Sequence, residues 1–199
     1  MKETRDHILA ISSALFLQKN FKEVSMKEIV TMTGLSKGAF YHYFKSKEQI
    51  FLEVVESIFS SIIDIDCNRF VKGSLHEYYE EYLLHLDATY RLLLAKNIIS
   101  PSFNLNYYSL LFDAMRFFPD FRLRMTAANA VERAVWLDVI RTARQNGEIR
   151  STMSDDQITD IFIHTNSGVG MSNIMAGSSD DTVEGLRAIW DGFYTSMRP

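Results

Sequence analysis

The residues of this chain with the clearest chemical purpose lie between Ser25 and Lys47, where small, basic and aromatic side chains follow one another. Lys37 can donate hydrogen bonds to guanine acceptors or to a phosphate group. Gly38 and Ala39 come directly after it and carry almost no side chain, so a helix that bears them can approach the major groove of DNA closely. The chemistry that these residues favour is recognition of double-stranded DNA.

Two short helices joined by a turn are expected to position these residues. Ser25 and Glu28 have the spacing of a capping box, in which the serine hydroxyl accepts from a first-turn amide and the glutamate reaches back to the cap amide. A helix should therefore begin at Met26. Gly34 can adopt the left-handed conformation that ends a helix.

The second helix should begin at Lys37, because Ser36 can cap it, and it should run through Phe44. Phe40 and Phe44 lie four positions apart, so both are predicted to pack into the core of a small domain. The two helices and their turn have the pattern of a helix-turn-helix.

The charge distribution agrees with this interpretation. Residues 1–50 hold eight Lys or Arg and five Asp or Glu, a net charge of +3, whereas the remaining residues have a net charge of −7. Affinity for nucleic acid comes largely from neutralised phosphates, so a basic amino-terminal module on an acidic body fits DNA binding.

The composition predicts a folded, helical protein. The 199 residues are 47% hydrophobic with three prolines, and no segment shows sustained strand alternation. Cys67 is the single cysteine, which excludes an intrachain disulfide framework and a thiolate zinc cluster. The sequence shows no leader-like segment and no run of about 18 apolar residues, so we expect a cytoplasmic protein without a membrane span.

Helix-start signals recur along the rest of the chain and predict an all-α fold of about nine helices. The further capping boxes are Ser46 with Gln49, Ser74 with Glu77, Ser154 with Gln157, and Asp181 with Glu184. Pro101 and Pro119 mark two breaks, and Gly147 should end the helix that contains Trp136.

Asp138 interrupts a segment, residues 134–140, that is otherwise apolar nearly all round. Such a segment suggests a helix surrounded by others, and a buried carboxylate is costly unless it is compensated. Asp138 is therefore expected either to pair with Arg133 or Arg141 or to contact a ligand.

Residues 34–48 closely resemble the signature of the TetR family of transcriptional regulators (TetR/AcrR-like), and residues 14–16 with Asn20 and Phe21 resemble the family's usual end of the first helix. Asn20 stands where the family usually has glycine, and Thr33 stands where alanine is common. The resemblance implies a three-helix DNA-binding domain at residues 1–47. A helical ligand-binding and dimerisation domain would follow at residues 48–199.

The resemblance also implies the DNA contacts. It assigns base-edge or groove contacts to Lys37, Gly38, Ala39 and Tyr41, and contacts to the DNA backbone to Ser25, Ser36, His42, Tyr43 and Lys47. Thr33 carries a hydroxyl in place of a methyl group and could reach a phosphate. Tyr41 and Lys47 could instead be solvated surface residues.

The last two predicted helices, residues 155–176 and 182–196, have apolar faces that need a partner. In TetR-type proteins the two C-terminal helices of each subunit form a four-helix dimer interface, and this pattern is similar. A homodimer would place two recognition helices in successive major grooves, about 34–36 Å apart, on a pseudo-palindromic operator.

The middle of the chain is rich in tyrosine and phenylalanine, which suits an apolar cavity with a few polar anchors. The resemblance implies that this cavity holds a small-molecule inducer, of aromatic or apolar character. The candidate ligand-binding residues are Tyr82, His85, Phe103, Tyr107, Phe112, Trp136, Asp138 and His164. For each of them an ordinary core position is an equally open interpretation.

The sequence thus predicts a dimeric, ligand-responsive transcriptional regulator that is not an enzyme and that acts as a repressor, the common behaviour of the family. No cofactor is expected, and no metal site, because His85 and His164 lack a short ligand spacing to each other or to Cys67. Two alternatives stay open: a small helical enzyme that uses His85 or His164 with Asp138, and a helical module that binds another protein.

Overall fold

The computed structural model describes residues 2–63, 66–95, 105–176 and 182–199. Within these ranges the chain forms nine α-helices, one short 3-10 helix and no strand, which confirms the predicted all-α fold. The helices are α1 (Lys2–Gln18), α2 (Met26–Thr33), α3 (Lys37–Tyr43), α4 (Lys47–Ile63), α5 (Leu75–Ala95), α6 (Leu105–Phe117), α7 (Pro119–Gln145), α8 (Asp155–Ala176) and α9 (Thr182–Met197), with the 3-10 helix at Cys67–Arg69.

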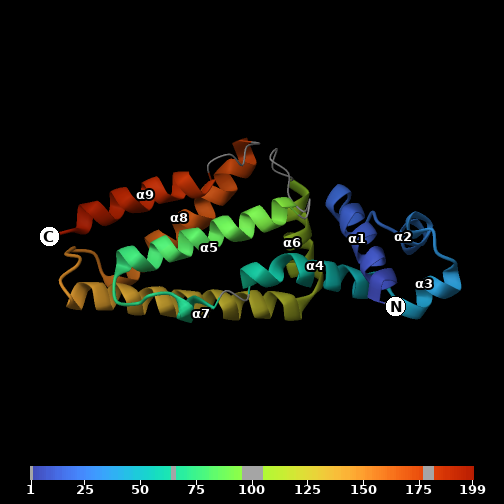
Figure 1. Ribbon diagram of the computed structural model, residues 1–199, viewed down its shortest axis with the longest axis horizontal. Helices are drawn as coiled ribbons and strands as arrows, with labels where there is room; N and C mark the ends of the chain where they lie inside the picture. Colours follow the sequence, from blue (N-terminus) through green and yellow to red (C-terminus); the bar gives the residue numbers. More distant parts are fainter. Residues whose placement is uncertain (1, 64–65, 96–104, 177–181) are drawn as a thin grey trace.

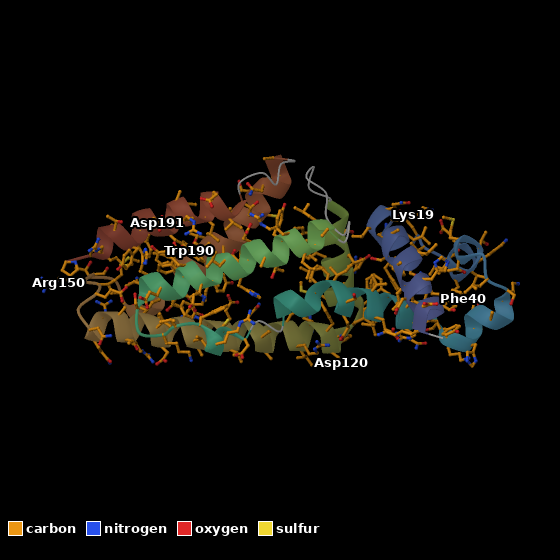
Figure 2. All side chains as sticks on the ribbon, viewed as in Figure 1. Lys19, Phe40, Asp120, Arg150, Trp190 and Asp191 are labelled. Carbon is orange, nitrogen blue, oxygen red and sulfur yellow. The ribbon has the colours of Figure 1, made fainter. Side chains whose placement is uncertain are left out.

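The molecule is elongated, with α1 to α3 at one end and the α5, α7, α8 and α9 bundle at the other (Figure 1). The helix α4 leads from the small end toward the bundle, and α7 runs along much of the length of the larger part. The side chains of Phe40 and Trp190, both fully buried, mark the cores of the two ends (Figure 2).

The predicted caps around the turn are present. The hydroxyl of Ser25 accepts a hydrogen bond from the Glu28 amide at 3.1 Å, and that of Ser36 accepts from the Ala39 amide at 3.3 Å. Gly34 ends α2 in the left-handed region, at φ 68°. The Glu28 carboxylate differs from the prediction: it pairs with Lys19 instead of reaching back to the cap, because α1 brings a cation within reach.

The other helix boundaries also follow local signals. Ser154 and Gln157 form a complete capping box, with hydrogen bonds of 3.2 and 2.9 Å in the two directions. Pro119 is the first residue of α7, and Gly147 follows the end of α7 at φ 73°. The predicted signals at Pro101 and Asp181 lie outside the described residues.

Two hydrophobic clusters form the core. The first joins α1 to α4 with the end of α5, α6 and the start of α7, and the second joins the earlier part of α5, the later part of α7, α8 and α9. Phe44 and Phe51 belong to the same first cluster, so packing is continuous across residue 47. The division into domains at that residue therefore stays a prediction.

The prediction of a buried Asp138 is wrong. The side chain of Asp138 is exposed, and so is Ala134 one turn earlier. Its expected partner Arg133 pairs instead with Asp156 and Asp160 of α8 at 2.8 and 3.0 Å. The apolar appearance of residues 134–140 misled because α7 lies at the edge of the bundle and keeps one face in solvent.

Candidate DNA-binding surface and ligand region

The helix α3 separates its side chains into two faces. Phe40 is fully buried in the first cluster, as is Phe44 just after the helix, which confirms their predicted core positions. Lys37, Gly38 and Ala39 are exposed on the opposite side. The start of α3, where the side chains are small, therefore faces solvent at one end of the molecule.

Two aromatic residues of α3 complete the outward face. Tyr41 is 40% exposed, and its ring meets the Phe40 ring edge-on at 5.7 Å between centroids. His42 is exposed, and its ring meets the half-buried Tyr43 ring at 5.4 Å. Tyr43 packs against the first cluster, which limits its rotamers, whereas the Tyr41 ring touches Phe40 and leaves its other side to solvent.

Lys45 is a cation of this surface that was not among the predicted contacts. Its ammonium donates a hydrogen bond to the Tyr41 carbonyl at the end of α3, and its side chain is exposed. The signal was present in the sequence as a third lysine within the same short basic segment.

The Thr33 hydroxyl, which could reach a phosphate according to the sequence, is turned into the protein, so this structure does not favour that contact. Only 6% of Thr33 is exposed, and its hydroxyl donates to the Val30 carbonyl at 2.9 Å. The Thr33 backbone contacts α1, whose His7 ring lies 3.2 Å from the Thr33 carbonyl. The hydroxyl is thus bonded within α2.

Phe21, in the loop between α1 and α2, is held from two helices. Its carbonyl accepts from the Lys47 ammonium at 2.7 Å, and its amide donates to the Asp113 carboxylate of α6 at 2.9 Å. Lys47 also donates to the Val24 carbonyl at 2.8 Å and lies over the Phe21 ring at 4.3 Å. Lys47 thus has a structural role, and its contact with DNA stays a prediction.

Ring contacts also connect the loop between α1 and α2 to α4 and α6. The Phe21 ring packs against Phe51 of α4 at 4.6 Å and against Phe118, just after α6, at 5.7 Å. The loop that connects α1 with α2 is therefore attached to both α4 and α6.

In the larger part, two of the predicted ligand residues belong to a packed aromatic core. Trp136 stacks on Phe162 at 5.0 Å and meets Tyr82 at 5.4 Å, and Trp190 lies 5.4 Å from Trp136. Trp136 and Tyr82 are 1% and 2% exposed, so their rings fill space in the second cluster.

The remaining predicted ligand residues are dispersed. Phe112 on α6 is 51% exposed, and His164 is exposed on the outer side of α8. His85 is half-buried, with its Nδ1 2.8 Å from the Arg69 guanidinium. Phe103 lies outside the described residues, as does the side chain of Tyr107. The described residues therefore do not gather these side chains, or the exposed Asp138, into one site.

Glu132 is the polar residue of this region that the sequence did not reveal. The Tyr82 hydroxyl donates to its carboxylate at 2.6 Å and accepts from the Asn166 amide at 3.2 Å. Burial raises the pKa of Glu132, and the Tyr82 hydroxyl and the Trp136 indole oppose that rise by stabilising the charge. The sequence around Glu132 does not reveal this contact, because the Tyr82 hydroxyl comes from α5, 50 positions earlier in the chain.

Replacing Glu132 with glutamine should raise the free energy of unfolding by about 1 kcal/mol at pH 7, because Gln can still accept from Tyr82 without a partly buried charge. The raised folded pKa means that the charge destabilises the fold above that pKa. The gain in unfolding free energy should shrink as the pH falls toward the pKa of glutamate in the unfolded chain, about 4.3. Urea unfolding at pH 7 and pH 5 measures this.

The exposed Asp138 on the same helix provides the control for that comparison. Asp138→Asn should change the free energy of unfolding by less than about 0.5 kcal/mol. A Glu132→Gln protein that is less stable than the parent at pH 7 would contradict the expected charge penalty.

Comparisons with known proteins address the family directly. Residues 8–54 match the family model described as bacterial regulatory proteins, tetR family. The chain is 30% identical over 119 residues to the HTH-type transcriptional regulator YerO of Bacillus subtilis, covering 54% of this chain and 41% of that protein. It is 33% identical over 87 residues to the HTH-type transcriptional regulator AcrR of Shigella flexneri, covering 43% and 40%.

The chain spans about two fifths of the length of these two curated relatives. The fold itself is shared over a longer range: the crystal structure of the MbdR regulator from Azoarcus sp. CIB aligns with 94% of this chain and 96% of its own, with a TM-score of 0.62 and 19% identity. Among the described residues, no helix is both long and apolar enough to cross a bilayer. The helix-turn-helix geometry and these matches together show that residues 8–54 are a TetR-family region, and over most of its length the chain shares the fold of the MbdR regulator.

Proposed function

We propose that this protein is a DNA-binding transcriptional regulator that represses transcription until a small molecule binds. The observation that carries the proposal is the outward face of α3, where Lys37, Gly38, Ala39 and Tyr41 are exposed while Phe40 anchors the helix from behind. The remaining proposed contacts, to the DNA backbone, are Ser25, Ser36, His42, Tyr43 and Lys47. We further propose that the chain has no enzymatic activity and that it binds chromosomal DNA in the cytoplasm.

Selection of bound duplexes from a random pool tests this proposal. Purified full-length protein should enrich a pseudo-palindromic sequence, and binding should weaken steeply as the salt concentration rises. Failure to enrich any duplex at low salt would refute DNA binding and would leave the exposed face of α3 to a protein partner.

The two C-terminal helices are proposed to form the dimer interface. The outer face of α8 and α9 carries a mostly apolar groove of about 520 Å³ whose lining includes Ile161, Val169 and Ile189. Met171 is 41% exposed and Ile189 is 45% exposed. Exposed apolar side chains that follow one another along two helices favour burial against a second copy. The selected duplexes test this too, since a dimer requires two half-sites about 10 base pairs apart, or a multiple of that.

The ligand is proposed to bind in the larger domain, residues 48–199, and to act on the DNA-binding domain, residues 1–47, through α4 and α6. The double attachment of Phe21 to Lys47 and Asp113 supports this route. Mass spectrometry of the native protein would identify a bound molecule. Operator affinity with and without that molecule then tests the switch, because a ligand shifts the equilibrium only by its differential affinity. An unchanged operator affinity at saturating ligand would refute it.

A further inference from the structure

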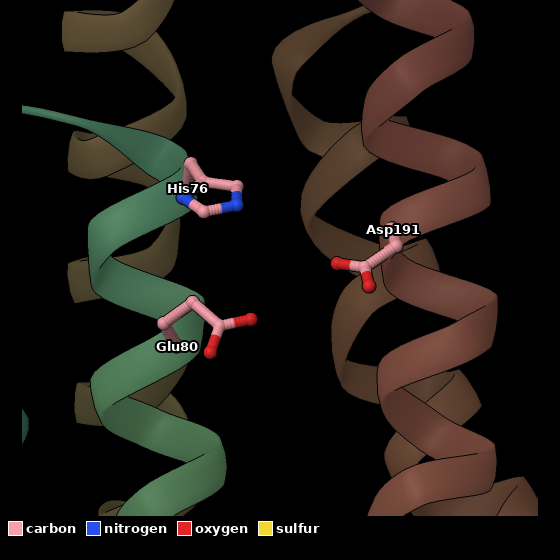
Figure 3. Close-up of side chains that lie close together, drawn as sticks. All are labelled: His76, Glu80 and Asp191. Atoms are coloured by element: carbon pink, nitrogen blue, oxygen red, sulfur yellow. The ribbon is translucent and has the colours of Figure 1, made fainter.

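A groove of about 600 Å³ opens between the start of α5 and the C-terminal half of α9, at the end of the molecule farthest from α3. Three side chains of this groove, His76, Glu80 and Asp191, bring one ligand atom each to within 4.8 Å of one another (Figure 3). They come from two helices that are far apart in sequence. The described residues elsewhere offer no comparable group of His, Cys, Asp and Glu side chains.

Helix geometry explains the arrangement. His76 and Glu80 are four positions apart on α5, so their side chains lie one above the other on the same face. Asp191 projects from α9 toward that face (Figure 3). An imidazole nitrogen and two carboxylate oxygens therefore converge from both sides of the groove.

The surroundings restrict how these three side chains are oriented. The Tyr79 hydroxyl donates to Asp191 Oδ1 at 2.8 Å, and Arg187 pairs with Oε2 of Glu80. The His76 ring lies against the rings of Tyr79 and Tyr194, at 5.1 and 5.3 Å between centroids. Carboxylates that bind metals are commonly hydrogen-bonded in this way through one oxygen, which leaves the other for the ion.

We propose that His76, Glu80 and Asp191 form a zinc-binding site that joins α5 to α9. One imidazole and two carboxylates suit a borderline divalent ion such as Zn²⁺. A tetrahedral zinc with bonds of about 2.0–2.2 Å needs ligand atoms roughly 3.3 Å apart. Zinc binding would therefore require these exposed and half-buried side chains to rotate toward one another.

Arg187 is the main competitor for the site. It neutralises part of the charge of Glu80, but the side chains of both residues are at least a quarter exposed, and such ion pairs contribute little free energy. The ion would have the second oxygen of Glu80, the carboxylate of Asp191 and the imidazole of His76. Water would complete the fourth position on the open side of the groove.

The site has a mechanical consequence. Zinc bound to both helices would fix the C-terminal half of α9 against the first two turns of α5. Because the ion binds the folded chain through residues that are far apart in sequence, it should raise the thermal stability of the protein. This effect does not depend on DNA binding.

The test uses the full-length chain, freed of metal with a chelator and then dialysed against ZnCl₂. About one zinc ion should bind per chain, and zinc at about 100 times its dissociation constant should raise Tm by about 5 °C or more. Co²⁺ in place of Zn²⁺ provides a second readout, a visible absorption band of a four-coordinate ion.

Variants assign the binding to these residues. His76→Gln and Asp191→Asn should each lose the bound zinc and the rise in Tm, while their melting without metal shows that they are folded. Glu77→Gln is the matched control, because Glu77 lines the same groove but is not one of the three ligands. The proposal is overturned if the parent binds no zinc at about 100 μM, if both variants retain it, or if Glu77→Gln loses it as well.

Discussion

Substituting leucine for Gly38 should remove operator binding while leaving the protein folded. No atom lies within 4 Å of a Cβ built on Gly38, so the chain itself has room for a side chain there. Glycine within a helix also costs about 1 kcal/mol of stability relative to better helix formers, so Tm should rise slightly. The DNA has no such room, because the backbone of a recognition helix must approach the base edges.

Operator affinity should fall by at least about 30-fold, or about 2 kcal/mol, a loss comparable with that of a specific base contact. Fluorescence anisotropy with a selected operator measures the loss, and a thermal melt checks the fold. Gly73→Leu is the matched control: Gly73 also has open space around it, and it precedes α5 at the opposite end of the molecule (Figure 1). Full operator affinity in the Gly38→Leu protein would show that α3 does not enter the groove.

Replacing Glu148 with alanine should lower the free energy of unfolding by about 2–3 kcal/mol. The Glu148 carboxylate accepts from the Leu75 and His76 amides at 2.9 and 3.0 Å and from the hydroxyls of Ser74 and Tyr194 at 2.9 and 3.1 Å. A negative charge thus satisfies the free amides at the start of α5 and interacts favourably with the helix dipole. Alanine would leave these donors without their acceptor.

The stability that is lost in the Glu148→Ala protein should be smaller at low pH than at neutral pH. Partial burial by itself would raise the pKa of Glu148, but the hydrogen bonds from His76, Leu75, Ser74 and Tyr194 lower it below the ordinary value of 4.5. A depressed folded pKa gives stability that is present above the unfolded pKa and is lost as the pH falls through the folded pKa. The difference between parent and Glu148→Ala should stay constant from about pH 7 to pH 5 and shrink below about pH 4.

Urea unfolding across this pH range measures the effect. Glu77→Ala is the control, since Glu77 lies in the same first turn of α5 with an exposed side chain, and its effect should stay within about 0.5 kcal/mol. Equal losses for the two variants would mean that Glu148 adds nothing beyond general negative charge near the helix start.

Features that depend on a few adjacent residues were predictable from the sequence. Ser36 caps α3 and Gly34 ends α2 because the hydroxyl and the glycine act on amides and dihedral angles within the same turn. The burial of Phe40 was equally predictable, because Phe40 and Phe44 lie four positions apart and so share one face. The all-α fold and the helix-turn-helix could therefore be predicted without coordinates.

Features that depend on which surfaces meet were decided only by the tertiary structure. Asp138 and Glu132 are both acidic residues of α7, yet Asp138 is exposed while Glu132 accepts from Tyr82 beneath α5 and α8. The spacing of His76 and Glu80 was visible in the sequence, but the approach of Asp191 was not. Helix packing sets which face of a helix is covered and what a distant segment brings to it, and no local pattern encodes that choice.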